Sequence, residues 1–77
     1  MMALTILTLR LEESTGIDFA TVRESTPQLR IDEPGLMVTI SPLSGAAVTR
    51  EEAEAARRFA DAARAYADEV QRLYTAG

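Results

Sequence analysis

Cysteine, histidine, tryptophan, lysine and asparagine are all absent from this 77-residue sequence. Without cysteine the chain can form no disulfide, no thiolate metal site and no thiol nucleophile. Without histidine, its serines lack the commonest base that activates a hydroxyl for nucleophilic attack. The glycines are scattered, so no glycine-rich loop is present to cradle a phosphate. We therefore expect a protein that is not an enzyme and that uses no cofactor and no metal.

Long hydrophobic runs are also lacking. No apolar stretch approaches the roughly 20 residues that a membrane-spanning helix needs. The N-terminal stretch MMALTILTLRLEE has no basic residue before its apolar part and runs directly into charge, unlike a secretory signal. We interpret it as a strand of a cytoplasmic protein that does not associate with membranes.

Positive charge is scarce, and the net charge is −4. This balance argues against direct nucleic-acid binding, which requires a clustered basic face to displace counterions. It suits a protein partner that has a basic surface. Every basic residue is an arginine, and lysine and asparagine are missing, which is the codon usage expected of a GC-rich bacterial or phage genome.

The length allows one domain, residues 1–77, whose core must be thin, so an oligomer or a partner would stabilise it considerably. The pattern of the chain predicts an α+β fold. We expect an antiparallel four-stranded β-meander over residues 1–41, a crossover loop over 42–48 and one long C-terminal α-helix over 49–76. The order of elements is then β-β-β-β-α.

The sequence QLRIDEPGLMVTIS predicts a hairpin around Pro34 and Gly35, because proline followed by glycine has turn chemistry. The register that follows places the apolar residues almost entirely on one face and the polar residues on the other. Its pairs are Glu33 with Leu36, Asp32 with Met37, Ile31 with Val38, Arg30 with Thr39 and Leu29 with Ile40.

The two earlier strands have weaker patterns. In ALTILTLRLE both faces are partly apolar, so this strand is either central in the sheet or faces a second subunit. After the turn ESTG, the β-branched residues of IDFATVRE, residues 17–24, favour a strand over a helix. The stretch STPQ should end that strand, because proline disfavours the helical region for the residue before it.

The last third of the chain predicts an uninterrupted helix with Thr49 as N-cap and Glu52 completing a capping box. An apolar stripe recurs at alternating steps of three and four residues: Ala56, Phe59, Ala63, Tyr66, Val70 and Leu73. Opposite charges four residues apart on the other side predict intrahelical pairs: Glu54 with Arg58, Arg57 with Asp61, Arg64 with Asp68, and Asp68 with Arg72.

Such a helix spans roughly 39 Å, whereas strands of six or seven residues span about 20–23 Å. Its far end needs a cover, either a second copy in a homodimer or a groove on another protein. The anchors of this contact are Tyr66, Val70, Leu73 and Tyr74. The alanines beside them would allow a close approach of another helix, or they are present only because alanine is the best helix former.

In a four-stranded meander the first and third turns lie at the same end, which would gather Glu12, Glu13, Asp32 and Glu33 on one rim. The helix C-terminus would bring Asp68 and Glu69 to the same rim, where the negative end of the helix dipole adds to the negative electrostatic field of the acids. Acids in turns commonly do no more than keep sheet edges soluble. The alternative is a docking surface for a basic partner.

Small size, acidity and the lack of catalytic residues are shared by many bacterial and phage inhibitors, including anti-CRISPR proteins and antitoxins. This is a similarity of class and assigns no residue a role. We expect a non-enzymatic protein-binding module that acts by occluding a partner. The alternative is a structural or assembly subunit that associates with itself through the C-terminal helix.

Overall fold

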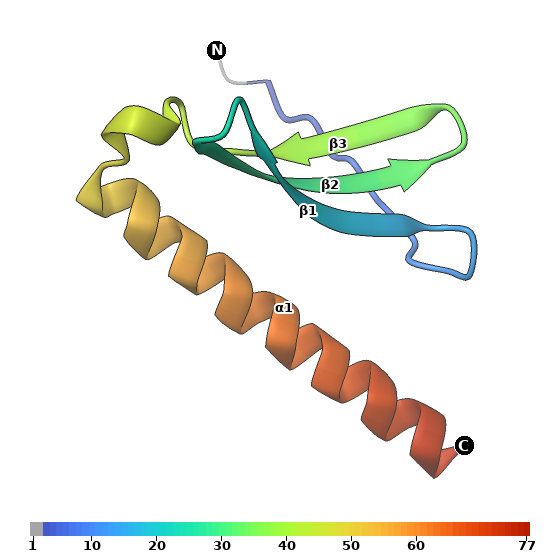
Figure 1. The fold of residues 1–77 in the computed structure, drawn as a ribbon. Helices are drawn as coiled ribbons and strands as arrows, with labels where there is room; N and C mark the ends of the chain where they lie inside the picture. The colour runs from blue at the N-terminus through green and yellow to red at the C-terminus, as the bar shows by residue number, and fades with distance from the viewer. Residues whose placement is uncertain (1–2) are drawn as a thin grey trace. The chain divides into compact units, whose positions relative to one another are not determined.

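The structure is a computed structural model that describes residues 3–77, and it is of the α+β class (Figure 1). It contains an antiparallel three-stranded sheet and one long C-terminal helix. The chain divides into two compact units, one that ends at Ser41 and one that begins at Pro42. The expectation of a single domain stays a prediction. The elements are β1 (Gly16–Val22), β2 (Thr26–Glu33), β3 (Leu36–Ile40), the 3-10 helix η1 (Gly45–Ala47) and α1 (Arg50–Ala76).

The hairpin of β2 and β3 is confirmed in every predicted pair, from Glu33 opposite Leu36 to Leu29 opposite Ile40. Pro34 and Gly35 alone form the loop, and Gly35 has a φ of 81°, a conformation that glycine adopts without steric cost. Because directly opposed residues share a face, the predicted apolar and polar faces of this ribbon are both present.

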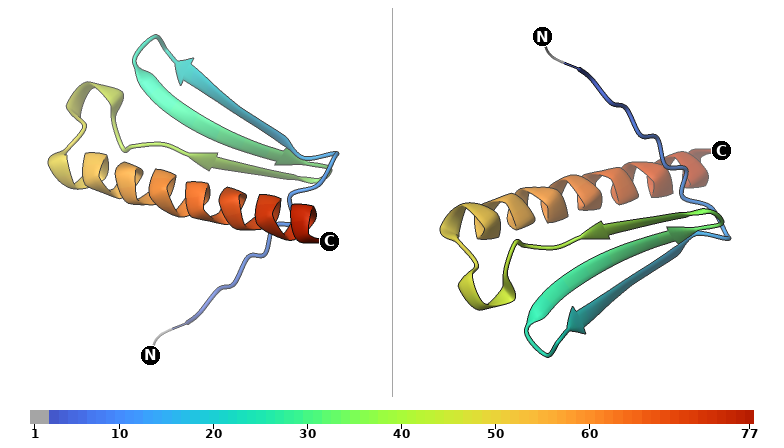
Figure 2. Two further views of the ribbon diagram at one scale, coloured as in Figure 1. Left: turned by 90° about the horizontal axis from the view of Figure 1, so that it is seen from below. Right: turned by 90° about the horizontal axis from the view of Figure 1, so that it is seen from above.

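Strand β1 extends the apolar face, because Ile17 lies opposite Ile31 and Phe19 opposite Leu29. Figure 2 shows β2 between β1 and β3, as the strand order β1-β2-β3 requires. The strand predicted over 17–24 ends at Val22, before STPQ, but Pro27 of that stretch lies inside the next strand, β2, opposite Thr21. The pairing of β3 with β2 begins only at Leu29, so Pro27 has a neighbouring strand on one side alone and its missing N–H interrupts no second ladder.

The predicted fourth strand is not formed within the described residues, because 3–12 contain no strand. Its apolar residues occur on both faces and specify no pairing register, whereas the turn before β1 is held by bonds of its own. The Thr15 backbone N–H donates to the Glu12 carbonyl at 3.0 Å, and the Thr15 hydroxyl donates to the carboxylate of Glu33 on β2. These bonds tie the turn to β2, and the chain that precedes it makes no ladder with β1.

The helix α1 begins after Thr49, and the predicted capping box is confirmed. The Thr49 hydroxyl accepts from the backbone N–H of Glu52 at 3.0 Å, and the Glu52 carboxylate accepts from the Thr49 N–H at 2.9 Å. At the other end the N–H of Gly77 donates to the Leu73 carbonyl at 3.0 Å. Among residues 3–77 no helix is both long enough and apolar enough to cross a membrane.

The charged side of α1 pairs differently from the prediction. None of the four expected pairs is an ion pair here, and the two that form within the helix are Arg50–Glu54 at 3.9 Å and Glu69–Arg72 at 2.5 Å. Exposed side chains on a helix have several partners within reach, and each pair contributes only about 0.2–0.5 kcal/mol, so spacing alone does not select among them.

Candidate binding surfaces

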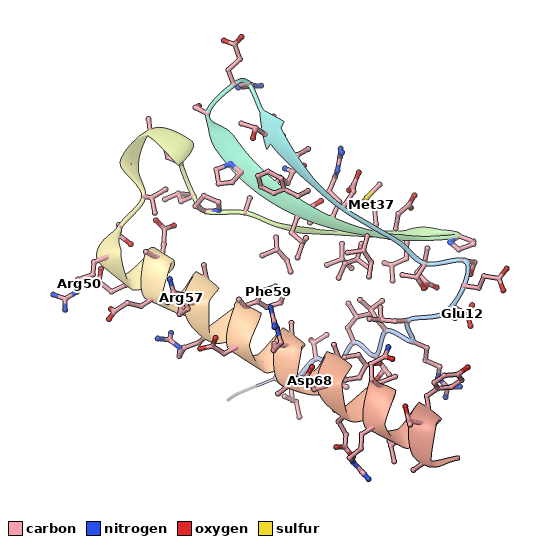
Figure 3. The ribbon with its side chains drawn as sticks, turned by 60° about the horizontal axis from the view of Figure 1, so that its bottom comes forward. Glu12, Met37, Arg50, Arg57, Phe59 and Asp68 are labelled. Carbon is pink, nitrogen blue, oxygen red and sulfur yellow. The ribbon has the colours of Figure 1, made fainter. Side chains whose placement is uncertain are left out.

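The first candidate surface is one end of the sheet, which we call the acidic end and define as Glu12, Glu13, Asp32 and Glu33. Figures 1 and 2 show the turn before β1 and the turn between β2 and β3 at this same end. The register explains the placement, since Gly16 at the start of β1 pairs with Asp32 near the end of β2. Figure 3 shows Glu12 in the turn that leads into β1. The sheet thus gathers the four carboxylates predicted for the rim.

Thr15 organises the acidic end. Its hydroxyl accepts a hydrogen bond from the Glu12 backbone N–H at 2.9 Å and donates to the Glu33 carboxylate. The Ser14 hydroxyl donates to the Glu12 carboxylate at 3.1 Å. Thr15 therefore links the turn that carries Glu12 and Glu13 to the strand that carries Glu33, although its role was not foreseen. The signal was the serine-threonine pair, because hydroxyls in turns commonly bond to nearby backbone.

The charge at this end is not neutralised by arginine. Within residues 3–77 none of the four carboxylates takes part in an ion pair. Asp18 on β1 provides the contrast, because it accepts two hydrogen bonds from the guanidinium of Arg30, each 3.2 Å long. Glu12, Glu13 and Asp32 are exposed and Glu33 is half-buried. The acidic end is therefore a group of four like charges, of which three are exposed to solvent.

Asp68 and Glu69 belong to the second unit, so their predicted place beside the acidic end stays a prediction. The Glu69 carboxylate accepts two hydrogen bonds from the Arg72 guanidinium, at 3.0 and 2.5 Å. This contact lowers the pKa of Glu69 and raises the pKa of Arg72. Glu69 is thus held by an arginine of its own helix and is a weaker candidate for a partner's cation than the sheet acids.

The second candidate surface is the apolar stripe of α1, defined by the same six residues as in the sequence. No side chain of the helix is buried. The four predicted anchors are all exposed, to 54% for Tyr66, 41% for Val70, 56% for Leu73 and 82% for Tyr74. Figure 3 labels Phe59, which belongs to the stripe, and Arg57 and Asp68, which belong to the charged remainder of the helix. A helix with this much apolar surface offers an interface to whatever covers it.

The loop before α1 contains a contact that the sequence did not reveal. The second oxygen of the Glu52 carboxylate accepts the backbone N–H of Leu43 at 3.0 Å, in addition to the capping bond from Thr49. The bond from Leu43 is the main reason that the pKa of Glu52 is lowered, and the backbone bond from Thr49 adds to it. One carboxylate thus caps the helix and anchors the loop that leads to it.

Neither a metal site nor a similar protein adds a further candidate site. Within residues 3–77, no three carboxylates are arranged so as to hold a metal ion. Compared with models of protein families, with curated proteins and with solved structures, the chain matches none.

Proposed function

We propose that the chain is a small, acidic, non-enzymatic protein-binding module that acts in the cytoplasm by occluding a partner. It would act in the manner of bacterial and phage inhibitors such as anti-CRISPR proteins and antitoxins. The observation that supports this most is the acidic end, where register and turn gather four carboxylates that no arginine of residues 3–77 pairs with. The partner is a protein with a basic surface.

The physical basis is electrostatic complementarity. Four like charges at one end of a small sheet produce a field that attracts a basic patch and raises the rate of encounter. A partner that uses its basic patch to bind nucleic acid or another acidic ligand loses access to that ligand once the patch is covered. Inhibition by occlusion needs no catalytic group, in keeping with the absence of cysteine and histidine.

The partner is identified by capture from a lysate of the native host, with chemical crosslinking and mass spectrometry to locate the contact. The captured protein is then purified and titrated with the chain at low and at moderate salt. We expect the affinity to fall steeply between the two, because exposed charges are screened over roughly 8–10 Å near physiological ionic strength. An affinity that does not change with salt contradicts the electrostatic mechanism.

A second candidate function is a structural or assembly subunit that associates with itself through α1. The exposure of the apolar stripe favours it, since none of its side chains is buried. Association through an apolar helix face depends little on ionic strength. The salt titration therefore separates the two functions.

A further inference from the structure

The apolar stripe of α1 has the period of a coiled coil. From Ala56 to Leu73 its members alternate by three and four residues, and a repeat of about 3.5 residues keeps one helix in continuous contact with another. The stripe has two rows. One contains Ala56, Ala63 and Val70, which are small, and the other contains Phe59, Tyr66 and Leu73, which are large.

The positions that flank the two rows are also free of charge along most of the helix. They are Ala53, Ala55, Ala60, Ala62, Ala67, Tyr74 and Ala76, with Glu69 as the exception. The carboxylate of Glu69 is already bound by Arg72. Alanine flanks allow two helix backbones to approach closely, and no unpaired charge of the flanks would have to be desolvated. The arginines and the remaining acids of α1 lie on the opposite side, apart from Glu52 in the first turn, whose carboxylate is engaged in capping.

We propose that a second copy of this chain covers the stripe, with the two α1 helices antiparallel about a two-fold axis. In the register centred between Arg64 and Ala65, every core layer joins a small residue of one copy to a large residue of the other. The layers are Ala56 with Leu73, Phe59 with Val70, and Ala63 with Tyr66, each occurring twice.

Side-chain volume decides the direction. A parallel pair would place Ala63 on Ala63 and Tyr66 on Tyr66, so empty and overfilled layers would alternate along the contact. Voids and overpacking each cost stability, whereas alternating large and small residues across facing positions fill a core evenly. The antiparallel arrangement also aligns the helix dipoles favourably. A two-fold contact uses the same patch on both copies and closes as a dimer.

The exposed area is sufficient for such a dimer. An aromatic side chain offers roughly 200 Å², so the exposed parts of Phe59, Tyr66 and Tyr74, at 45%, 54% and 82%, amount to about 350 Å² per copy. With Val70 and Leu73 the two copies together offer on the order of 1,000 Å², the area that a specific interface needs. The helix of 27 residues is roughly 40 Å long and β2 of eight residues about 26 Å, so no strand within residues 3–77 matches the length of α1.

This inference is independent of the proposed inhibitor role, because it concerns the helix and not the acidic end. Its consequence for that role is bivalency, since a dimer carries two acidic ends. Two linked sites bind a partner that is itself dimeric more tightly than either site alone.

The mass and the direction of the pair are measured on the full chain. Sedimentation at tens of micromolar should give a mass of twice 8.4 kDa. The lack of native cysteine allows single spin labels at Glu51→Cys or Ala65→Cys. In the antiparallel pair the labels at 65 lie close together and the labels at 51 about 40 Å apart, because 27 residues of helix rise separate them. Short distances at both positions, or a monomer at several hundred micromolar, would overturn the proposal.

The layers themselves are tested by exchange of side chains. Tyr66→Ala alone should weaken the dimer at least a hundredfold, because two filled layers are lost per dimer. The double variant Ala63→Tyr with Tyr66→Ala restores a small and a large residue in each of these layers and should recover most of the affinity. Ala65→Leu, on the charged side, is the control and should leave the mass unchanged. A double variant as weak as Tyr66→Ala, at equal helix content, would contradict the register.

Discussion

Replacing Ile31 by aspartate tests the assignment of the two faces of the sheet. Ile31 is half-buried in the central strand, opposite Ile17 on one side and Val38 on the other. Full burial of such a side chain stabilises by about 1.5–3 kcal/mol, so half of it contributes about 0.8–1.5 kcal/mol. A carboxylate without a partner among aliphatic groups costs roughly another 1–3 kcal/mol. We expect a loss of about 2–4 kcal/mol, against a total stability of roughly 4–12 kcal/mol for a chain of this length.

The neighbouring residue supplies a matched control. Arg30 lies on the polar face and pairs with Asp18, but both side chains are partly exposed, at 38% and 61%. Arg30→Gln should therefore cost less than about 1 kcal/mol. Urea unfolding followed by circular dichroism, at one fixed protein concentration, measures the loss of stability in both variants. With a slope near 1 kcal/mol per molar, the midpoint should fall by roughly 2 M or more for Ile31→Asp and by under 1 M for Arg30→Gln. Equal shifts would refute the assignment of the faces.

Three further predictions concern the turns and the cap. Glu24 has a φ of 66° in the turn between β1 and β2, so Glu24→Gly should raise the free energy of unfolding by about 1 kcal/mol, and a decrease would contradict the turn geometry. Thr15→Val should lower it by about 1 kcal/mol, measured by urea unfolding, because the bonds to Glu12 and Glu33 are lost while the shape is kept; an unchanged midpoint would show that these bonds do not stabilise the turn. Because the pKa of Glu52 is lowered from 4.5, its contribution to the stability of the folded state is present above pH 4.5 and is lost as the pH falls through the lowered pKa. Part of the helix content should therefore be lost in acid, which circular dichroism follows. Glu52→Gln should abolish this acid-dependent part, whereas Glu51→Gln should retain it, because Glu51 makes no capping bond.

The hairpin and the helix could be predicted because each is encoded by local signals that agree. Around Pro34 and Gly35 the alternation of apolar and polar residues fixes a register, and a slip by one residue would turn every apolar side chain of a strand to the other face. At Thr49 the capping box and the apolar period indicate the same helix start. Consistent signals of this kind leave few alternatives for the chain.

The stretch before Glu12 was mispredicted because its apolar residues occur on both faces and therefore specify no register. The turn that follows it is tied by the Thr15 hydroxyl to Glu33, a residue distant in sequence, so the local pattern does not reveal how this turn is held. The acidic end was predicted from a fourth strand that is not formed. Its four acids nevertheless lie at one end, because the turn before β1 and the turn after β2 fix their position without that strand.

The central claim, that the acidic end binds a basic protein partner, is tested by charge reversal in two variants that have the same net charge as each other. In one variant Glu12, Glu13, Asp32 and Glu33 become lysine. In the control, four acids outside the acidic end become lysine: Glu24, Glu51, Glu54 and Asp61. Both are checked by circular dichroism for the native fold and titrated into the captured partner at low salt. We predict that the first loses binding and the control retains it within about tenfold. Binding of the first variant as tight as that of the wild type would contradict the claim.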